Sequence, residues 1–101
     1  MYAMTGKLVA QHGKRTALVE LLKQAAVLMG KIPQCRLYIV NEDRSNEIHV
    51  YIYELWTDKA AHDDSLKNEQ VRKLIVQARP LLAAAPDGAE LNAVGGHGVD
   101  F

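Results

Sequence analysis

The sequence predicts an α+β fold, the ferredoxin-like βαββαβ sandwich with a four-stranded antiparallel sheet, in a single domain over residues 1–101. Two observations lead to this prediction. Residues 35–41 and 47–56 are rich in β-branched and aromatic side chains and flank the charged stretch "EDRSN", which is typical of a β-hairpin. Segments with helical periodicity stand on both sides of this hairpin, and strand-like segments stand near both ends of the chain. The resulting order, β-α-β-β-α-β, is that of the split βαβ motif.

The first half of the chain supplies one strand and one long helix. Residues 1–10 alternate as a strand does, with Met4 and Leu8 on one face. Residues 14–30 form an amphipathic helix, and Gly30 is a suitable stop because glycine tolerates the backbone conformation found after a helix. The apolar positions at helical spacing are Leu18, Leu21, Leu22, Ala25 and Met29.

The second half, after the hairpin, supplies two helical segments and a last strand. Thr57 or Asp58 can cap a helix that begins in residues 57–66. A second helix follows, which Pro80 bends or ends, and the apolar stripe of this helix is Val71, Leu74, Ile75, Ala78 and Leu82. The stretch "APDG" predicts a turn before a strand over residues 89–96, and a tail over about 96–101 ends the chain.

The strand over residues 47–56 is apolar on both faces, which predicts that both faces are covered. One face carries Ile48, Val50, Ile52 and Trp56, and the other carries Tyr51, Tyr53 and Leu55. The helices of the same chain can cover only one face of such a sheet. We therefore expect a homodimer in which a second copy covers the other sheet face.

Composition argues against several classes of protein. Twelve basic residues balance twelve acidic ones without a basic stripe, so nucleic-acid binding is not expected. No apolar stretch approaches the roughly 20 residues of a membrane span, and the first residues do not resemble a secretory signal, so we expect a cytoplasmic protein with no membrane partner. The single cysteine, Cys35, excludes an internal disulfide and is expected to be a small buried strand residue.

Two interpretations of the segment around Trp56 and His62 stay open from the residues alone. Trp56 either lines a pocket or packs in the core, and His62 is either a proton acceptor at a pocket mouth or a solvated helix residue. Glu54 shares a strand face with Trp56, where a carboxylate needs a partner or a raised pKa. It acts as a general base or, the interpretation we favour, pairs with a basic residue such as Lys7, Arg36 or Arg72. The four histidines form no ligand pair at helical spacing, so no metal site is expected.

Three stretches, "GKRTALVELL", "CRLYIV" and "YELWTDKAAHDDSLKNEQVRKLI", resemble the antibiotic-biosynthesis monooxygenase-like superfamily, most specifically in the Y-E-x-W-x-x-x-x-A segment from Tyr53 to Ala61. The resemblance implies a dimeric α+β barrel with a pocket between each sheet and its helices. It also implies oxidation of electron-rich aromatic substrates by O2, often without a metal or flavin cofactor. In such a reaction a phenol or hydroquinone loses its proton, and the anion gives an electron directly to O2.

The same resemblance implies roles for particular residues. Trp56 matches the family tryptophan that ends the third strand, His62 stands where some members have a tyrosine facing the substrate, and Ser65 stands where many have a histidine. Haem-degrading members use an asparagine on the first strand, and this chain has none there, which argues against haem.

We therefore expect a cofactor-independent monooxygenase acting on a quinol or a polyketide-type phenol. In this hypothesis Trp56 and Tyr38 hold the ring, and His62 is the base or hydrogen-bond partner, assisted by Ser65. The other expected substrate-binding residues are Ile52, Glu54, Leu74 and Ile75. The alternatives are a small-molecule-binding dimer without turnover and an isomerase on the same scaffold.

Overall fold

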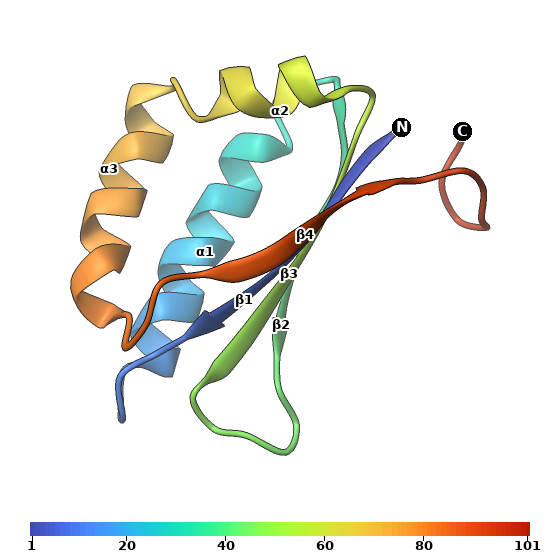
Figure 1. The fold of residues 1–101 in the computed structure, drawn as a ribbon. Helices are drawn as coiled ribbons and strands as arrows, with labels where there is room; N and C mark the ends of the chain where they lie inside the picture. Colours follow the sequence, from blue (N-terminus) through green and yellow to red (C-terminus); the bar gives the residue numbers. More distant parts are fainter.

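The computed structural model describes all residues, 1–101, and has the predicted order of elements. Figure 1 shows the sheet as one layer and the helices as a second layer on one of its sides. The elements are β1 (Tyr2–Val9), α1 (Arg15–Met29), β2 (Cys35–Glu42), β3 (His49–Trp56), α2 (Lys59–Ser65), α3 (Glu69–Ala78), the 3-10 turn η1 (Arg79–Leu81) and β4 (Asp87–Asn92). The α+β, ferredoxin-like fold predicted from the sequence is confirmed.

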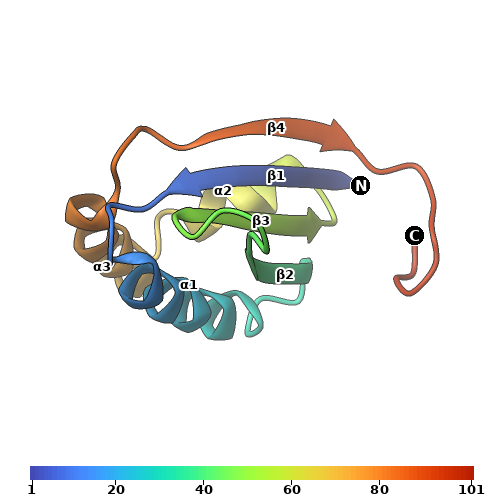
Figure 2. The same ribbon diagram turned by 90° about the horizontal axis from the view of Figure 1, so that it is seen from below.

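The sheet has the strand order β2-β3-β1-β4, and every neighbouring pair is antiparallel. Figure 2, seen from below, shows β4 at one edge and the helices on a single side of the sheet. Tyr38 and Met4 are the register partners of Glu54 on its two neighbouring strands. Because side chains alternate along a strand, these three residues point to the same face. Tyr53, one residue along, points to the opposite face.

Short polar side chains cap the starts of α2 and α3. Of the two caps expected for α2, Asp58 is the one used, since its carboxylate accepts the backbone N–H of Ala61 at 2.8 Å. Asn68 caps α3 by accepting the N–H groups of Gln70 and Val71. Pro80, which has no N–H to donate, lies in η1 directly after α3 ends. Capping therefore sets the position of α2 relative to the end of β3.

The last strand begins and ends earlier than the sequence predicts. The expected bounds were residues 89–96, with a turn over 85–88, whereas β4 spans Asp87–Asn92. Gly88 explains the shift, because a Cβ built there would lie only 2.3 Å from the carbonyl oxygen of Thr5. Glycine in this stretch therefore permits close backbone approach to β1 rather than a turn.

The core consists of two hydrophobic clusters between the sheet and the helices. One cluster contains the fully buried Leu18 and Val50, together with Ala10 and Ile52. The other gathers Met29, Trp56 and Val71, and the Trp56 side chain is completely buried. These clusters lie toward opposite ends of β3, and Tyr38 packs against both of them.

Candidate active site

An apolar cavity of about 510 Å³ lies between the sheet and the helix layer. Its volume falls in the range of small-molecule pockets, and most of its lining side chains are hydrophobic. Helices α1 and α3 form one side of the cavity, and strands β1, β2 and β3 form the other. The lining residues are Met4, Leu8, Leu21, Leu22, Ala25, Met29, Tyr38, Glu54, His62, Leu66, Val71, Leu74, Ile75, Ala78, Arg79, Leu82 and Pro86.

Tyr38, Glu54 and His62 bring polar groups to one end of this cavity. Tyr38 and Glu54 are register partners on β2 and β3, so strand alternation places both on the helix-facing side. His62 comes from α2, where it and Ser65 are the buried residues. Their spacing puts both on the face of α2 that packs inward. The interpretation of His62 as a solvated residue is wrong, because only 6% of its surface is exposed.

The two ring nitrogens of His62 have different neighbours. Nδ1 lies 3.0 Å from Oδ1 of Asp63, and Nε2 lies 3.9 Å from Oε1 of Glu54. The hydrogen bond to His62 lowers the pKa of Asp63, so Asp63 is a carboxylate and can only accept. Nδ1 therefore carries the hydrogen of this bond. In the neutral imidazole, Nε2 then holds the lone pair, on the Glu54 side of the ring.

A surface network holds Asp63 in place. Lys59 Nζ lies 3.3 Å from Oδ2 of Asp63 and 3.0 Å from Oε1 of Glu90, which ties α2 to β4. Tyr2 donates its hydroxyl to Glu90 at 2.8 Å, and its ring centroid lies 5.2 Å from that of His62. Burial and the Glu90 carboxylate raise the pKa of Tyr2 to about 12, so its phenol stays a donor. His62 is thus fixed from the solvent side as well as from the cavity side.

Glu54 pairs with none of Lys7, Arg36 and Arg72, which corrects the partners expected from the sequence; the basic side chain near it is His62. Its Oε1 instead accepts the indole N–H of Trp56 at 3.1 Å and lies near His62. Lys7 cannot meet it, because it stands at an odd position of β1 and points to the opposite sheet face. Burial raises the pKa of Glu54, and the Trp56 hydrogen bond and the nearby His62 oppose that rise only in part.

We expect the Glu54→Gln substitution to stabilise the fold at pH 8 but not at pH 4. The raised pKa means that folded Glu54 keeps its proton at pH values where the unfolded chain has lost it. The contribution of Glu54 to the free energy of unfolding is thus fully present below pH 4.5, the ordinary pKa of a glutamate. This contribution falls as the pH rises through the pKa of the folded state. Glutamine removes that loss and can still accept the Trp56 N–H. Urea unfolding at both pH values measures the free energy of unfolding, and Glu47→Gln at an exposed position is the control. An equal change in this free energy at pH 4 and pH 8 would contradict the prediction.

Tyr38 presents an unused donor to the cavity. Its phenol oxygen takes part in no hydrogen bond within the chain, and the partly buried side chain lines the cavity. Burial, with a contribution from the charge of Glu54, raises the pKa of Tyr38 well above its ordinary range. The phenol therefore stays protonated at neutral pH and can donate to a ligand oxygen.

The other expected site residues fall in three places. Leu74 and Ile75 line the cavity. Trp56 and Ile52 lie in the two core clusters, where Trp56 backs Glu54 through its hydrogen bond. Ser65 is buried at the end of α2, where its hydroxyl donates to the carbonyl of His62. It does not line the apolar cavity but borders a smaller hollow near Asp58 and Asn68.

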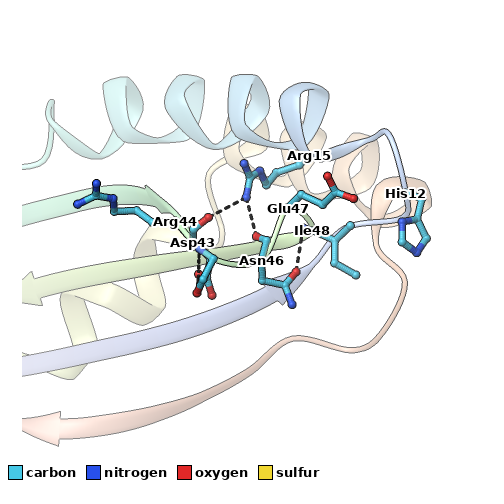
Figure 3. Close-up of a pocket in the computed structure, with 8 residues that line it drawn as sticks. His12, Arg15, Asp43, Arg44, Asn46, Glu47 and Ile48 are labelled. Carbon is cyan, nitrogen blue, oxygen red and sulfur yellow. Dashed lines mark hydrogen bonds between the residues drawn. The ribbon is translucent and has the colours of Figure 1, made fainter.

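Another hollow, of about 570 Å³, lies at the β2–β3 loop, and Ile48 is the one hydrophobic residue in its lining. Figure 3 shows Arg15 reaching from the start of α1 toward this loop. Its Nη1 donates to the carbonyls of Asp43 at 3.1 Å and Asn46 at 2.8 Å. Asp43 and Asn46 also accept backbone N–H groups of the loop with their own side chains. These polar groups are therefore engaged in holding the hairpin against α1.

Asp63 and Arg79 are the site residues that sequence patterns did not reveal. Asp63 follows His62 directly, and neighbours on a helix surface ordinarily point in different directions. The contact between Nδ1 of His62 and Oδ1 of Asp63 depends on side-chain conformation, which periodicity does not predict. Arg79 lies just after the apolar stripe of α3, and only the packing of α3 over the sheet places it on the cavity.

Comparison with known proteins identifies the family. The sequence profile described as antibiotic biosynthesis monooxygenase matches residues 1–77. The chain belongs to this family. Membership gives it a monooxygenase-like role at the level of the family, and the resemblance noted in the sequence is confirmed.

Solved structures agree with this assignment. A candidate antibiotic biosynthesis monooxygenase from Chloroflexus aurantiacus is 34% identical, with 98% of each chain covered and a TM-score of 0.88. A corresponding protein from Deinococcus radiodurans shares 24% identity over 100% of both chains, with a TM-score of 0.84. One from Nitrosomonas europaea shares 10% identity over 94% of this chain and 100% of its own, with a TM-score of 0.89. The last two show the fold alone.

The curated proteins include no match to the chain. Within the structure, none of the helices has both the length and the apolar character that crossing a bilayer requires.

Proposed function

We propose that this family member is a monooxygenase that oxidises a small phenol or hydroquinone with O2 in the apolar cavity. One observation carries the proposal: a buried histidine, oriented by a carboxylate, stands at the polar end of a cavity large enough for an aromatic ring. Asp63 accepts from Nδ1 of His62, which leaves Nε2 as the proton acceptor. A solvent-exposed His62 would favour a binding protein without turnover, but His62 is buried.

In the proposed reaction, Nε2 of His62 takes the proton of the substrate hydroxyl. Asp63 and Glu54, one on each side of the ring, stabilise the imidazolium that results. Tyr38 donates its free phenol hydrogen to the substrate oxygen and so stabilises the anion. The hydrophobic lining, including Leu74 and Ile75, excludes water from the reactive anion.

The bond changes balance without a further reductant. The phenolate gives one electron to O2, and the resulting superoxide and phenoxyl radical couple at a hydrogen-bearing ring carbon ortho or para to the hydroxyl. The peroxide formed there loses the ring hydrogen and its outer oxygen, which leaves as water with the proton held by His62. One phenol and one O2 thus give one quinone and one water. One atom of O2 enters the product and the other is reduced.

Oxygen uptake by the purified protein tests this function directly. A panel of hydroquinones and polycyclic phenols is supplied, and the spontaneous oxidation of each is subtracted. We expect uptake proportional to protein concentration, with one labelled oxygen atom from ¹⁸O2 in the product. No uptake above the spontaneous rate across the panel would favour the binding or isomerase alternatives.

We also propose that a second copy of the chain covers the open face of the sheet. Ile39, Tyr53 and Leu91 point to this face and are 43%, 46% and 48% exposed. Ile39 and Tyr53 are direct register partners, and in the next row Ala3 lies between Leu91 and the buried Leu55. Such a contiguous apolar surface is typical of a protein interface rather than of a solvated sheet face.

We expect Ile39→Glu to convert a dimer into a monomer. A two-fold interface places the substitution in both copies, and each buried carboxylate loses its hydration, which disfavours association. Sedimentation velocity measures the mass, and Val76→Glu on the outer side of α3, where Val76 is 60% exposed, is the matched control that should remain a dimer. A monomeric wild type, or a dimeric Ile39→Glu variant, would exclude this interface.

A further inference from the structure

The cavity carries polar groups at both of its ends. His62 and Glu54 stand where β3 ends and α3 begins, whereas Arg79 stands where α3 ends. Figure 1 shows these as opposite ends of the helix layer, with α2 at the top and the end of α3 at the bottom. From Val71 to Arg79, both of which line the cavity, the helix axis advances by about 12 Å at roughly 1.5 Å per residue. The cavity is thus long enough for a molecule larger than a single ring.

Arg79 is the only basic residue other than His62 on the cavity wall. It takes part in none of the ion pairs of the chain, and its side chain is exposed at the rim of the cavity. The negative C-terminal end of the α3 dipole favours a cation at this position. It does not occupy the N–H donors of the guanidinium, which stay available to a ligand. An always-charged group without a partner at the rim of an apolar cavity attracts an anion of matching shape.

We propose that Arg79 binds a carboxylate of the substrate, at the end of the molecule opposite to the hydroxyl that reacts. The substrate class is then an extended aromatic hydroxycarboxylate, of two or more fused rings, rather than a neutral hydroquinone. This inference rests on the proposed function only for the orientation of the hydroxyl toward His62. A guanidinium holds a carboxylate through two parallel N–H···O bonds, which fixes direction as well as affinity.

The distribution of charge along the cavity gives this orientation a physical reason. At the end beside His62, the acidic side chain of Glu54 offers a carboxylate no favourable partner, and Asp63 already occupies Nδ1 of His62. At the opposite end, Arg79 offers several donors and no competing anion. The substrate therefore enters with its carboxylate at Arg79 and its hydroxyl toward Tyr38 and His62.

Binding without O2 tests the proposal independently of turnover. The probes are the hydroxynaphthoate whose hydroxyl and carboxylate stand at opposite ends of the two rings, and its uncharged amide. Naphthol fluorescence, followed anaerobically, gives the Kd of each. We expect wild type to prefer the acid by about tenfold, as for a hydrogen bond to a charged group. Arg79→Gln should abolish the preference by weakening only the acid, and Arg79→Lys should restore part of it.

Arg72→Gln is the matched control. Arg72 lies on α3, which ends directly before Arg79, and is exposed as Arg79 is, but it does not line the cavity. Its loss should leave both Kd values unchanged, which shows that general surface charge is not the cause. The proposal is overturned if wild type does not prefer the acid, if Arg79→Gln weakens both probes equally, or if Arg72→Gln matches Arg79→Gln.

Turnover of the same two probes separates this inference from the proposed function. Arg79→Gln should raise KM for the acid and leave kcat unchanged, because Arg79 lies far from the reacting hydroxyl. His62→Gln should lower kcat for both probes. If wild type turns over both probes but does not prefer the acid, the role of Arg79 is removed and the proposed reaction is kept. Acid-selective binding without any turnover would remove the proposed reaction and keep the anion subsite.

Discussion

The His62→Gln variant is expected to bind aromatic ligands normally and to lose kcat by about a hundredfold or more. General base catalysis by a positioned side chain contributes on the order of 10²–10⁴ to a rate. Glutamine is similar in size and polar, but it has no nitrogen that can take a proton at neutral pH. Steady-state O2 uptake with a phenol that wild type oxidises measures the loss, and thermal unfolding checks that the fold is intact.

Asp63→Asn is the informative companion to this variant. Asparagine can accept the Nδ1–H of His62, but without its charge it stabilises the imidazolium less, so kcat should fall about tenfold with KM little changed. Asp64→Asn is the matched control, because Asp64 is exposed and contacts only Lys67 through its side chain. If Asp64→Asn lowers kcat as much as Asp63→Asn, the orientation of His62 by Asp63 is not the cause. Unchanged kcat in His62→Gln would remove His62 as the base.

The Trp56→Ala variant is expected to lose about 3–5 kcal/mol of unfolding free energy, the typical cost of truncating a buried large aromatic side chain. Trp56 is completely buried between Met29 and Val71, and its indole N–H is the only direct donor to the Glu54 carboxylate. Its loss therefore opens a cavity and also leaves Glu54 without a partner. Urea unfolding followed by circular dichroism measures this change.

Two further variants separate the contributions at Trp56. Trp56→Phe keeps much of the packing and removes the indole donor, so its loss should be smaller, about 1–3 kcal/mol. Phe101→Ala, in the C-terminal tail, truncates an aromatic side chain that is 55% exposed and should change stability by less than about 0.5 kcal/mol. A loss below about 1 kcal/mol for Trp56→Ala would place the tryptophan on a solvated pocket wall instead of in the core.

Periodicity alone predicted much of this fold. The alternation along the hairpin placed Tyr38 and Glu54 on strands, and the spacing of Leu74 and Ile75 placed them on the inner side of a helix. Both are local properties, set by the geometry of a strand or a helix whatever packs against it. The bounds of β4 were missed because the role of Gly88 depends on how close β1 lies, and that is a contact between segments far apart in the chain.

The roles of the polar residues depended on contacts that no local pattern encodes. The sequence determined that Glu54 lies on an apolar strand face, and electrostatics then required a partner for it. Lys7 and Arg36 were reasonable partners by charge, but the register of the sheet turns Lys7 to the opposite face. Tertiary structure decided that Trp56 and His62 surround this carboxyl instead.

By itself, then, the sequence determined the order of elements, the amphipathic faces and the family, because each is written in residue spacing along the chain. Only the tertiary structure decided that His62 is buried, that Asp63 orients it, and that Arg79 stands at the far end of the same cavity. The physical reason is that burial and hydrogen bonding depend on how α2 and α3 pack across the sheet. That packing is set by caps, register and core shape acting together over the whole domain.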